Sequence, residues 1–210
     1  MRAERVTRKR LIGCDFGETS EYRRQFFQAM GKICLSSPEK MQDWFFNRFL
    51  PLMTNVLKNN FTARTELAGF FAQVGKNDSM KISVYSDYPF LEQRMKAVGL
   101  ENFQGIGLYD SDFFGAQKPA PRPLLSIAND MNLDPKDILV VGDRKDTDGM
   151  AACRAGMGFY FLHNSKNKKC KKTQGCKLCT FTGNWADFCE FLPLAVDRLA
   201  VVRQPCNCSN

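Results

Sequence analysis

An alternation of strand-sized apolar runs with helical stretches is the feature that most constrains the fold, and it extends from Lys81 to Leu162. The apolar runs are too short for helices, and the stretches between them carry apolar residues at helical spacing. Strands that are apolar on both faces and alternate with helices are typical of a parallel sheet covered by helices. We therefore predict an α/β fold with a doubly wound, Rossmann-like parallel sheet. The predicted strands are 82–86, 105–109, 138–141 and 158–162, and the predicted helices are 90–98, 122–131 and 149–155.

The part of the chain before this alternation is predicted to be helical. From Glu21 to Val74 it is rich in Phe, Met and Leu at helical spacing, which indicates three or four helices. We divide the chain into an N-terminal helical cap segment (1–76), an α/β core (77–195) with a lysine- and cysteine-rich loop (164–180), and a C-terminal tail (196–210). Two apolar helix faces are expected, formed by Phe26, Phe27, Met30 and Ile33 and by Trp44, Phe45, Phe49 and Leu52.

The net charge of +8 does not by itself indicate a nucleic-acid-binding protein, because of where the charge lies. Residues 1–10 carry a net charge of +4 and residues 166–177 a net charge of +6, so the remainder of the chain sums to −2. We therefore expect no nucleic acid partner. No apolar run approaches the roughly 20 residues needed to span a bilayer, and no secretory signal is visible. A cytoplasmic protein without a membrane partner is the expectation.

Nine cysteines, six of them in the last 41 residues, raise the alternative of a structural zinc site. Cys170, Cys176 and Cys179, with Cys189 as a fourth ligand, would supply the thiolates that tetrahedral zinc sites use. One Cys-x-x-Cys pair without a matched second pair is weak evidence for such a site. We favour a solvated loop for the lysine-rich segment around these cysteines.

Three carboxylates follow the strand predicted at 138–141. Asp143, Asp146 and Asp148 place hard oxygen ligands on one loop. Mg²⁺ prefers such ligands and is usually held by one or two carboxylates together with substrate phosphate and water. The alternative is that these acids only cap the next helix, whose N-terminus favours negative charge. Three acids at one strand end exceed what a cap requires, so we favour a metal site.

Two further motifs offer phosphate-binding groups. Ser86 and Asp87 follow the strand predicted at 82–86, where a hydroxyl and free backbone N–H groups ahead of a helix would cradle a phosphate. A serine that only caps the helix would look the same. Lys118 precedes Pro119, which restricts it to extended conformations, so its side chain would be aimed with little backbone freedom. Taken alone, a solvated loop lysine is the simpler interpretation.

In combination, these motifs resemble the haloacid dehalogenase (HAD) superfamily of phosphohydrolases over residues 78–163. Ser86 at a strand end, Lys118 before a proline, and Asp143 with Asp148 five residues on match three family motifs in order, type and spacing. The resemblance implies that Ser86 binds phosphoryl oxygens and that Lys118 neutralises charge on the nucleophile and the phosphate. It also implies that Asp143 ligates Mg²⁺ and that Asp148 supports the metal through its water shell.

The family's first motif, Asp-x-Asp-Gly-Thr after a buried strand, has no clean match. The nearest segment, 14–19, keeps Asp15 as a candidate nucleophile but has Gly17 where the resemblance places the acid/base aspartate. In one alternative, residues 1–75 all belong to the cap and the nucleophile lies upstream of Met1. In the other, Asp15 is the counterpart in an altered member of the family. We favour the first, although a sheet without its central strand would expose apolar edges.

The function that follows from the resemblance is a Mg²⁺-dependent phosphatase. It would hydrolyse a small phosphorylated metabolite through an aspartyl-phosphate intermediate. The second hypothesis is a non-catalytic module that binds phosphate and Mg²⁺, motivated by the glycine at position 17. Phosphoryl transfer needs mainly positioning and electrostatic stabilisation, which a hydroxyl, a lysine and a metal supply.

Overall fold

The chain forms two compact units, Met1–Gln117 and Lys118–Asn210. The computed structural model describes residues 2–74, 80–101, 105–163 and 180–198. Parallel strands and helices occur in both units, which confirms the predicted α/β class.

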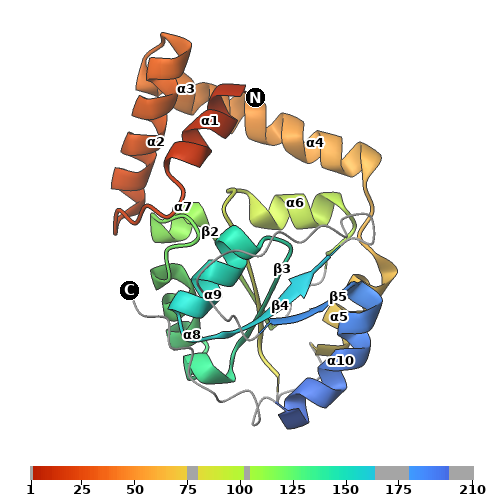
Figure 1. The fold of residues 1–210 in the computed structure, drawn as a ribbon. Coiled ribbons are helices and arrows are strands. Elements are labelled where there is room, and N and C mark those ends of the chain that lie inside the picture. Colours follow the sequence, from red (N-terminus) through yellow and green to blue (C-terminus); the bar gives the residue numbers. More distant parts are fainter. Residues whose placement is uncertain (1, 75–79, 102–104, 164–179, 199–210) are drawn as a thin grey trace. The chain divides into compact units, whose positions relative to one another are not determined.

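The first unit begins with a group of helices (Figure 1). The helices between residues 2 and 60 meet in one aromatic cluster, in which Phe45 packs edge-on against Phe26 and Phe27. The described chain forms four α-helices between residues 19 and 74, which confirms the prediction of three or four helices there. The elements are α1 (Arg2–Arg10), α2 (Thr19–Cys34), α3 (Pro38–Trp44), the π-helical turn η1 (Phe45–Phe49), α4 (Leu50–Asn60) and α5 (Thr65–Val74).

One of the two predicted apolar faces is displaced by the π-helical turn. Phe45 and Phe49 are buried as expected, but Leu52 is 60% exposed whereas Leu50 is fully buried. The wider i→i+5 turn of η1 adds a residue to the helical repeat, so the next position facing the core is Met53. The expectation that Leu52 lies on this face was therefore wrong.

The basic N-terminal segment is the helix α1 and not a strand ahead of Asp15. Its polar side chains are partly buried, because Arg8 forms an ion pair with Glu4 and lies 3.8 Å above the ring of Tyr88. Arg8 also donates a hydrogen bond to the backbone carbonyl of Asp87. Pairing and ring stacking compensate for taking the guanidinium group out of water.

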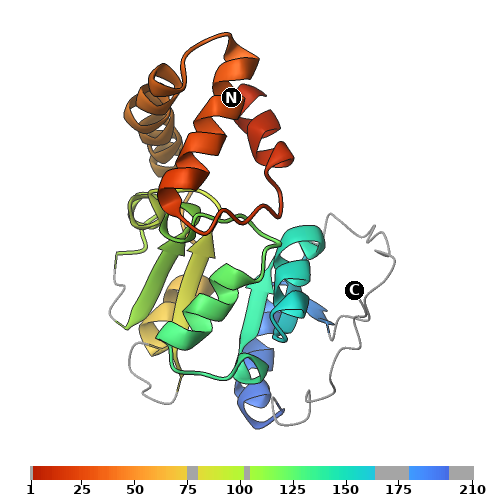
Figure 2. The ribbon, with the colours of Figure 1, turned by 90° about the vertical axis from the view of Figure 1, so that its left-hand side faces the viewer.

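A two-stranded parallel sheet completes the first unit. Figure 2 shows its strands as adjacent arrows that point the same way. Ser86, the last residue of the first strand, is in register with Asp110 of the second. Apolar residues of both strands, of the helix between them and of α5 pack in a second buried cluster. The elements are β1 (Ile82–Ser86), α6 (Leu91–Ala97), β2 (Ile106–Asp110) and α7 (Ser111–Phe114).

The second unit contains a three-stranded parallel sheet in the order β3-β4-β5. The strands predicted at 138–141 and 158–162 are confirmed, and Figure 1 shows helix α10 beside β5, two elements that the sequence did not predict. The elements are α8 (Arg122–Asp130), the 3₁₀ turn η2 (Pro135–Asp137), β3 (Leu139–Gly142), the π-helical turn η3 (Lys145–Gly149), α9 (Met150–Arg154), β4 (Gly158–Leu162), β5 (Thr180–Gly183) and α10 (Trp185–Arg198).

Each sheet has an edge strand that carries one of the predicted motifs. Within the described residues β1 pairs with β2 alone and β3 with β4 alone, and every residue of β1 and β3 is partly exposed. Residues 164–179, which hold most of the predicted lysine- and cysteine-rich loop, and residues 199–210 of the predicted tail lie outside the described part of the chain. Among the described helices, none is long and apolar enough to cross a membrane.

Candidate functional site

The end of strand β3 and the turn after it position the acidic residues of the second unit. Gly142 ends the strand, and a Cβ atom there would lie 2.5 Å from Oδ2 of Asp148. The absence of a side chain at Gly142 therefore lets the Asp148 carboxylate lie against the strand end. The π-helical turn η3 carries Asp148 into this position, and the residue is buried.

Lys118 and Asp148 form a mostly buried ion pair. Lys118 Nζ lies 2.7 Å from Asp148 Oδ1, and the two side chains are 15% and 11% exposed. The second oxygen, Oδ2, accepts a hydrogen bond from the backbone N–H of Arg144 at 3.2 Å. With both oxygens bound to donors, Asp148 is held as an oriented carboxylate, and the lysine is held at its side. The structure thus brings together two of the predicted site residues that are thirty positions apart.

The other two acids of the loop have different surroundings. Asp146 is exposed and forms an ion pair with Arg144 at 2.7 Å, whose hydrogen bond lowers the pKa of Asp146. Asp143, directly after β3, is exposed, and no described residue forms a hydrogen bond or ion pair with its carboxylate. The three carboxylates are therefore not equivalent, and Asp143 is the one available to a ligand.

The motif on this loop implies a magnesium ion. Among the described residues there is no group of three His, Cys, Asp or Glu side chains able to hold a metal ion. Mg²⁺ does not require one, because it usually keeps several waters and takes one or two carboxylates plus substrate phosphate. The uncommitted carboxylate of Asp143 and the oriented carboxylate of Asp148 fit that requirement. The capping alternative applies to Asp148 as well, because its Oδ2 atom accepts the backbone N–H of Arg144, the N-cap residue of η3.

The predicted phosphate-binding residues of the first unit lie at the carboxyl end of β1. Ser86 Oγ accepts hydrogen bonds from the backbone N–H of Tyr88 at 3.1 Å and from Arg94 Nη2 at 2.7 Å. The backbone carbonyl of Asp87 accepts a bond from the Ser111 hydroxyl at 2.8 Å. Sequence reasoning missed Arg94, because one arginine in an ordinary amphipathic helix carries no signal that its side chain turns back to the preceding strand.

Asp15 lies in a short extended segment that forms an antiparallel bridge with Ala116. Its Oδ1 atom accepts a hydrogen bond from the backbone N–H of Gly17 at 3.0 Å. Gly17 has φ +77°, a conformation that favours glycine, and the space around its Cα is open. An aspartate at this position would therefore be strained, although it would not clash.

The six predicted site residues fall into two groups by unit. The first unit holds Asp15, Ser86 and Asp87, and the second holds Lys118, Asp143 and Asp148. Of the cysteines in the zinc alternative, Cys189 is described and partly buried, whereas Cys170, Cys176 and Cys179 lie outside the described residues. The zinc site stays a prediction.

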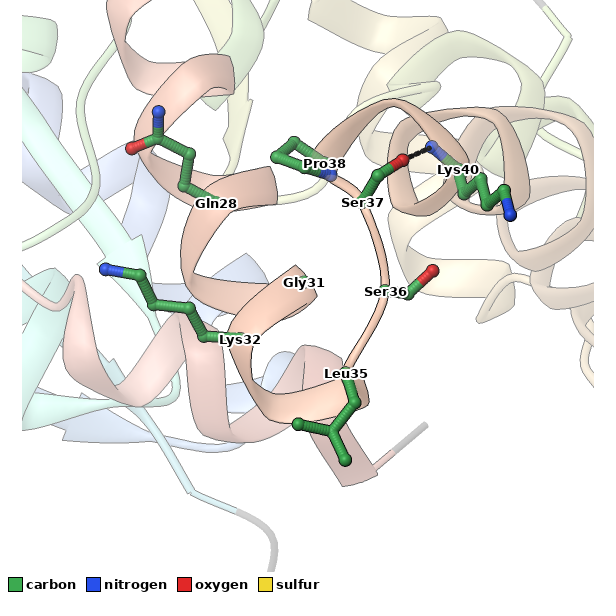
Figure 3. Close-up of a pocket in the computed structure, with 8 residues that line it drawn as sticks. All are labelled: Gln28, Gly31, Lys32, Leu35, Ser36, Ser37, Pro38 and Lys40. Carbon is green, nitrogen blue, oxygen red and sulfur yellow. Dashed lines mark hydrogen bonds between the residues drawn. The ribbon is translucent and has the colours of Figure 1, made fainter.

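An open pocket of about 770 Å³ lies at the turn between α2 and α3 (Figure 3). Figure 3 shows the side chains of Lys32 and Lys40 pointing away from each other, so the polar groups of this pocket do not converge on a common point. Ligand sites normally combine a cavity with a few convergent polar groups. We therefore do not treat this pocket as the functional site. It is lined by Gln28, Gly31, Lys32, Leu35, Ser36, Ser37, Pro38 and Lys40.

Comparison with known proteins agrees with the fold. Residues 115–175 match the model of the HAD-hydrolase-like family, and this segment includes Lys118, Asp143 and Asp148. The parallel strands with their helices place the chain in the Rossmann-like α/β class of folds. Over the 61 matched residues the chain is similar to the HAD-hydrolase-like family. No curated protein sequence matches the chain.

Several solved structures share the fold at low sequence identity. A 2-haloacid dehalogenase from Pseudomonas syringae pv. Tomato DC3000 is 19% identical, with a TM-score of 0.58 over 86% of this chain and 71% of the other. A predicted phosphoglycolate phosphatase from Haemophilus somnus 129pt is 19% identical, with a TM-score of 0.57 over 84% and 78%. A HAD family hydrolase from Deinococcus radiodurans R1 with bound phosphate and sodium is 18% identical, with a TM-score of 0.54 over 84% and 76%.

Proposed function

We propose that the protein is a Mg²⁺-dependent phosphatase of a small phosphorylated metabolite. The observation that carries the proposal is the Lys118–Asp148 ion pair at 2.7 Å, beside the uncommitted carboxylate of Asp143. A fixed cation and an available hard oxygen ligand at one strand end are suited to a phosphoryl group. One structural neighbour is described as a predicted phosphoglycolate phosphatase, and another holds phosphate. A cytoplasmic location belongs to the same proposal.

Each residue has a role that its surroundings support. Lys118 would stabilise the negative charge of the phosphoryl oxygens, because its ammonium group is already fixed by Asp148 and loses little freedom on binding. Ser86 and Asp87 would bind the phosphoryl oxygens through the hydroxyl and the loop backbone. Asp143 would hold Mg²⁺, with Asp148 orienting its water shell. When bound, the metal would neutralise charge on the phosphate.

The candidate nucleophile within this sequence is Asp15. Its carboxylate oxygen would attack phosphorus as the bond to the leaving oxygen breaks, and water would then hydrolyse the aspartyl phosphate. The leaving group needs a proton, and Gly17 has no side chain to supply it. That observation favours a second candidate function, a non-catalytic module that binds phosphate and Mg²⁺.

Hydrolysis of p-nitrophenyl phosphate by the full chain tests the proposal. We expect activity with Mg²⁺, loss of activity on chelation, and at least about a hundredfold loss for Asp143→Asn, since the metal would lose its protein ligand. Asp146→Asn is the matched control on the same loop, because Asp146 is paired with Arg144, and it should retain activity. Full activity in Asp143→Asn, or activity that survives chelation, would reject the proposal.

Asp15→Asn separates the two candidate functions. If Asp15 is the nucleophile, this variant loses hydrolysis while it still binds inorganic phosphate. If the unchanged protein binds phosphate and Mg²⁺ but hydrolyses nothing, the binding module is the correct function. Phosphate affinity is measured by isothermal titration calorimetry on both proteins.

A further inference from the structure

Arg94 of α6 is bound to the loop that follows β1. Its Nε atom donates a hydrogen bond to the carbonyl oxygen of Pro89 at 3.1 Å, and its Nη2 atom donates to the carbonyl oxygen of Tyr88 at 2.6 Å. The same Nη2 atom donates to Ser86 Oγ at 2.7 Å. These three bonds fix the planar guanidinium group in one orientation. Arg94 is therefore held by the loop and reaches Ser86 with a defined geometry.

The Ser86 hydroxyl already accepts two hydrogen bonds, one from Arg94 and one from the backbone N–H of Tyr88. A hydroxyl group has two acceptor lone pairs and one O–H donor. With both lone pairs occupied, the O–H donor is what Ser86 has left for another partner. That partner must be a hydrogen-bond acceptor. A charged donor on the oxygen also polarises the O–H bond, which strengthens it as a donor.

Charged groups of both signs lie around this loop, because Arg8 is paired with Glu4 and Arg94 lies near Asp110. Burial lowers the pKa of Arg94, the charge of Asp110 opposes that shift, and nearby Arg8 adds to it. Arg8 donates to the Asp87 carbonyl of the same loop. Two guanidinium groups therefore flank the residues that follow β1, and Asp110 is in register with Ser86 on the neighbouring strand.

We propose that Arg94 is a positioning residue that makes the Ser86 hydroxyl a dedicated donor to a phosphoryl oxygen. The proposal rests on the proposed function, because it specifies how Ser86 binds the phosphate of that function. Arg94 acts through Ser86 and does not itself touch the phosphoryl group. Without Arg94, a lone pair of Ser86 becomes free, and the hydroxyl can rotate toward water or toward its own backbone.

A double-mutant cycle on phosphate affinity tests this inference. Inorganic phosphate is titrated calorimetrically, in the presence of Mg²⁺, into the unchanged protein, Ser86→Ala, Arg94→Met and the double variant. We expect Arg94→Met to weaken binding about tenfold, the loss expected for one hydrogen bond to a charged group. In the Ser86→Ala background the same change should weaken binding by less than about twofold, because the hydroxyl that Arg94 positions is gone.

Lys96→Met is the matched control. Lys96 lies on the same helix, is half exposed and pairs with Glu92, so this variant removes one positive charge from α6 without touching Ser86. It should change phosphate affinity by less than about twofold. If circular dichroism shows that Arg94→Met does not fold, Arg94→Lys takes its place in the cycle, since it keeps the charge but lacks the planar fork.

The outcomes separate this inference from the function on which it rests. The positioning role would be overturned if Arg94→Met weakened phosphate binding equally with and without the Ser86 hydroxyl. It would also be overturned if Lys96→Met weakened binding as much as Arg94→Met. Either result would leave the phosphatase proposal standing. An unchanged protein that neither binds phosphate nor hydrolyses a phosphate ester would overturn both.

Discussion

Lys118 and Asp148 form an ion pair at 2.7 Å in which neither side chain is more than 15% exposed. A buried pair of this kind adds little stability compared with apolar residues, but removal of one partner leaves an uncompensated charge out of water. The pair therefore does more to fix the two side chains in place than to stabilise the fold. Replacing one member of the pair should therefore destabilise the protein more than replacing both.

Lys118→Met is expected to destabilise the protein by about 3 kcal/mol, because Asp148 would remain buried without its cation. The double variant Lys118→Met/Asp148→Asn should recover a large part of that loss. Urea denaturation measures both. Lys136→Met is the control, since Lys136 pairs with Asp134 on the surface, where such pairs contribute about 0 to 1 kcal/mol. Equal losses for the buried and exposed lysines would contradict the prediction.

Gly115→Ala should be much more damaging than Gly99→Ala, although both glycines have positive φ angles, +64° and +88°. A Cβ atom at Gly115 would lie 2.4 Å from the backbone carbonyl of Glu18, whereas nothing lies within 4 Å of one at Gly99. Gly99→Ala should therefore cost about 1 kcal/mol from backbone strain alone. Gly115→Ala adds a backbone clash, and its thermal unfolding midpoint should fall clearly below that of Gly99→Ala.

The alternation of apolar runs and helices was sufficient to predict the strands β1 to β4. It could not predict α1, because that helix carries few apolar residues and is held by the buried Arg8–Glu4 pair and by contacts with Tyr88. It also missed β5, four residues that follow the lysine-rich segment. Elements that depend on long-range contacts leave little periodic signal in the chain.

For the candidate site, the sequence likewise predicted the residues but not their contacts. Order and spacing of the motifs identified Lys118, Asp143 and Asp148 as candidates. They did not show which of three acids within six residues the lysine would pair with, because the π-helical turn η3 decides which carboxylate faces the strand end. The contact between Arg94 and Ser86 was equally hidden, since it depends on where a helix places one long side chain.

Leu50→Ala and Leu52→Ala test the displacement of the apolar face by the π-helical turn. Leu50 is fully buried, so its truncation should cost about 3 kcal/mol through lost contacts and a cavity. Leu52 is 60% exposed, and its truncation should change the free energy of unfolding by less than about 0.5 kcal/mol. Denaturant unfolding of both variants gives the comparison. If Leu52→Ala were the more destabilising of the two, the regular helical face expected from the sequence would be the correct one.

Asp110→Asn should stabilise the protein more at neutral pH than at acidic pH. Burial, followed by the charge of Asp112, raises the pKa of Asp110 above its usual value of 3.8. The folded state therefore holds this proton more tightly than the unfolded state, and stability falls as pH rises from about the unfolded pKa through the folded one. Asparagine removes this loss and can still accept the capping bonds from Asp112 and Phe113.

Asp134→Asn should change stability with the opposite pH dependence, so it serves as the control for Asp110→Asn. Asp134 is also a capping residue, but it is exposed and its hydrogen bond with Lys136 lowers its pKa. Its carboxylate contributes stability that is present above the unfolded pKa and lost as pH falls through the folded one, so Asp134→Asn should be neutral in acid and unfavourable at pH 7. Urea unfolding between pH 3 and pH 7 measures both variants. If the stabilities of the two variants changed in the same way with pH, burial would not be what sets the charge state of Asp110. It would then not set the electrostatic balance around Arg94 either.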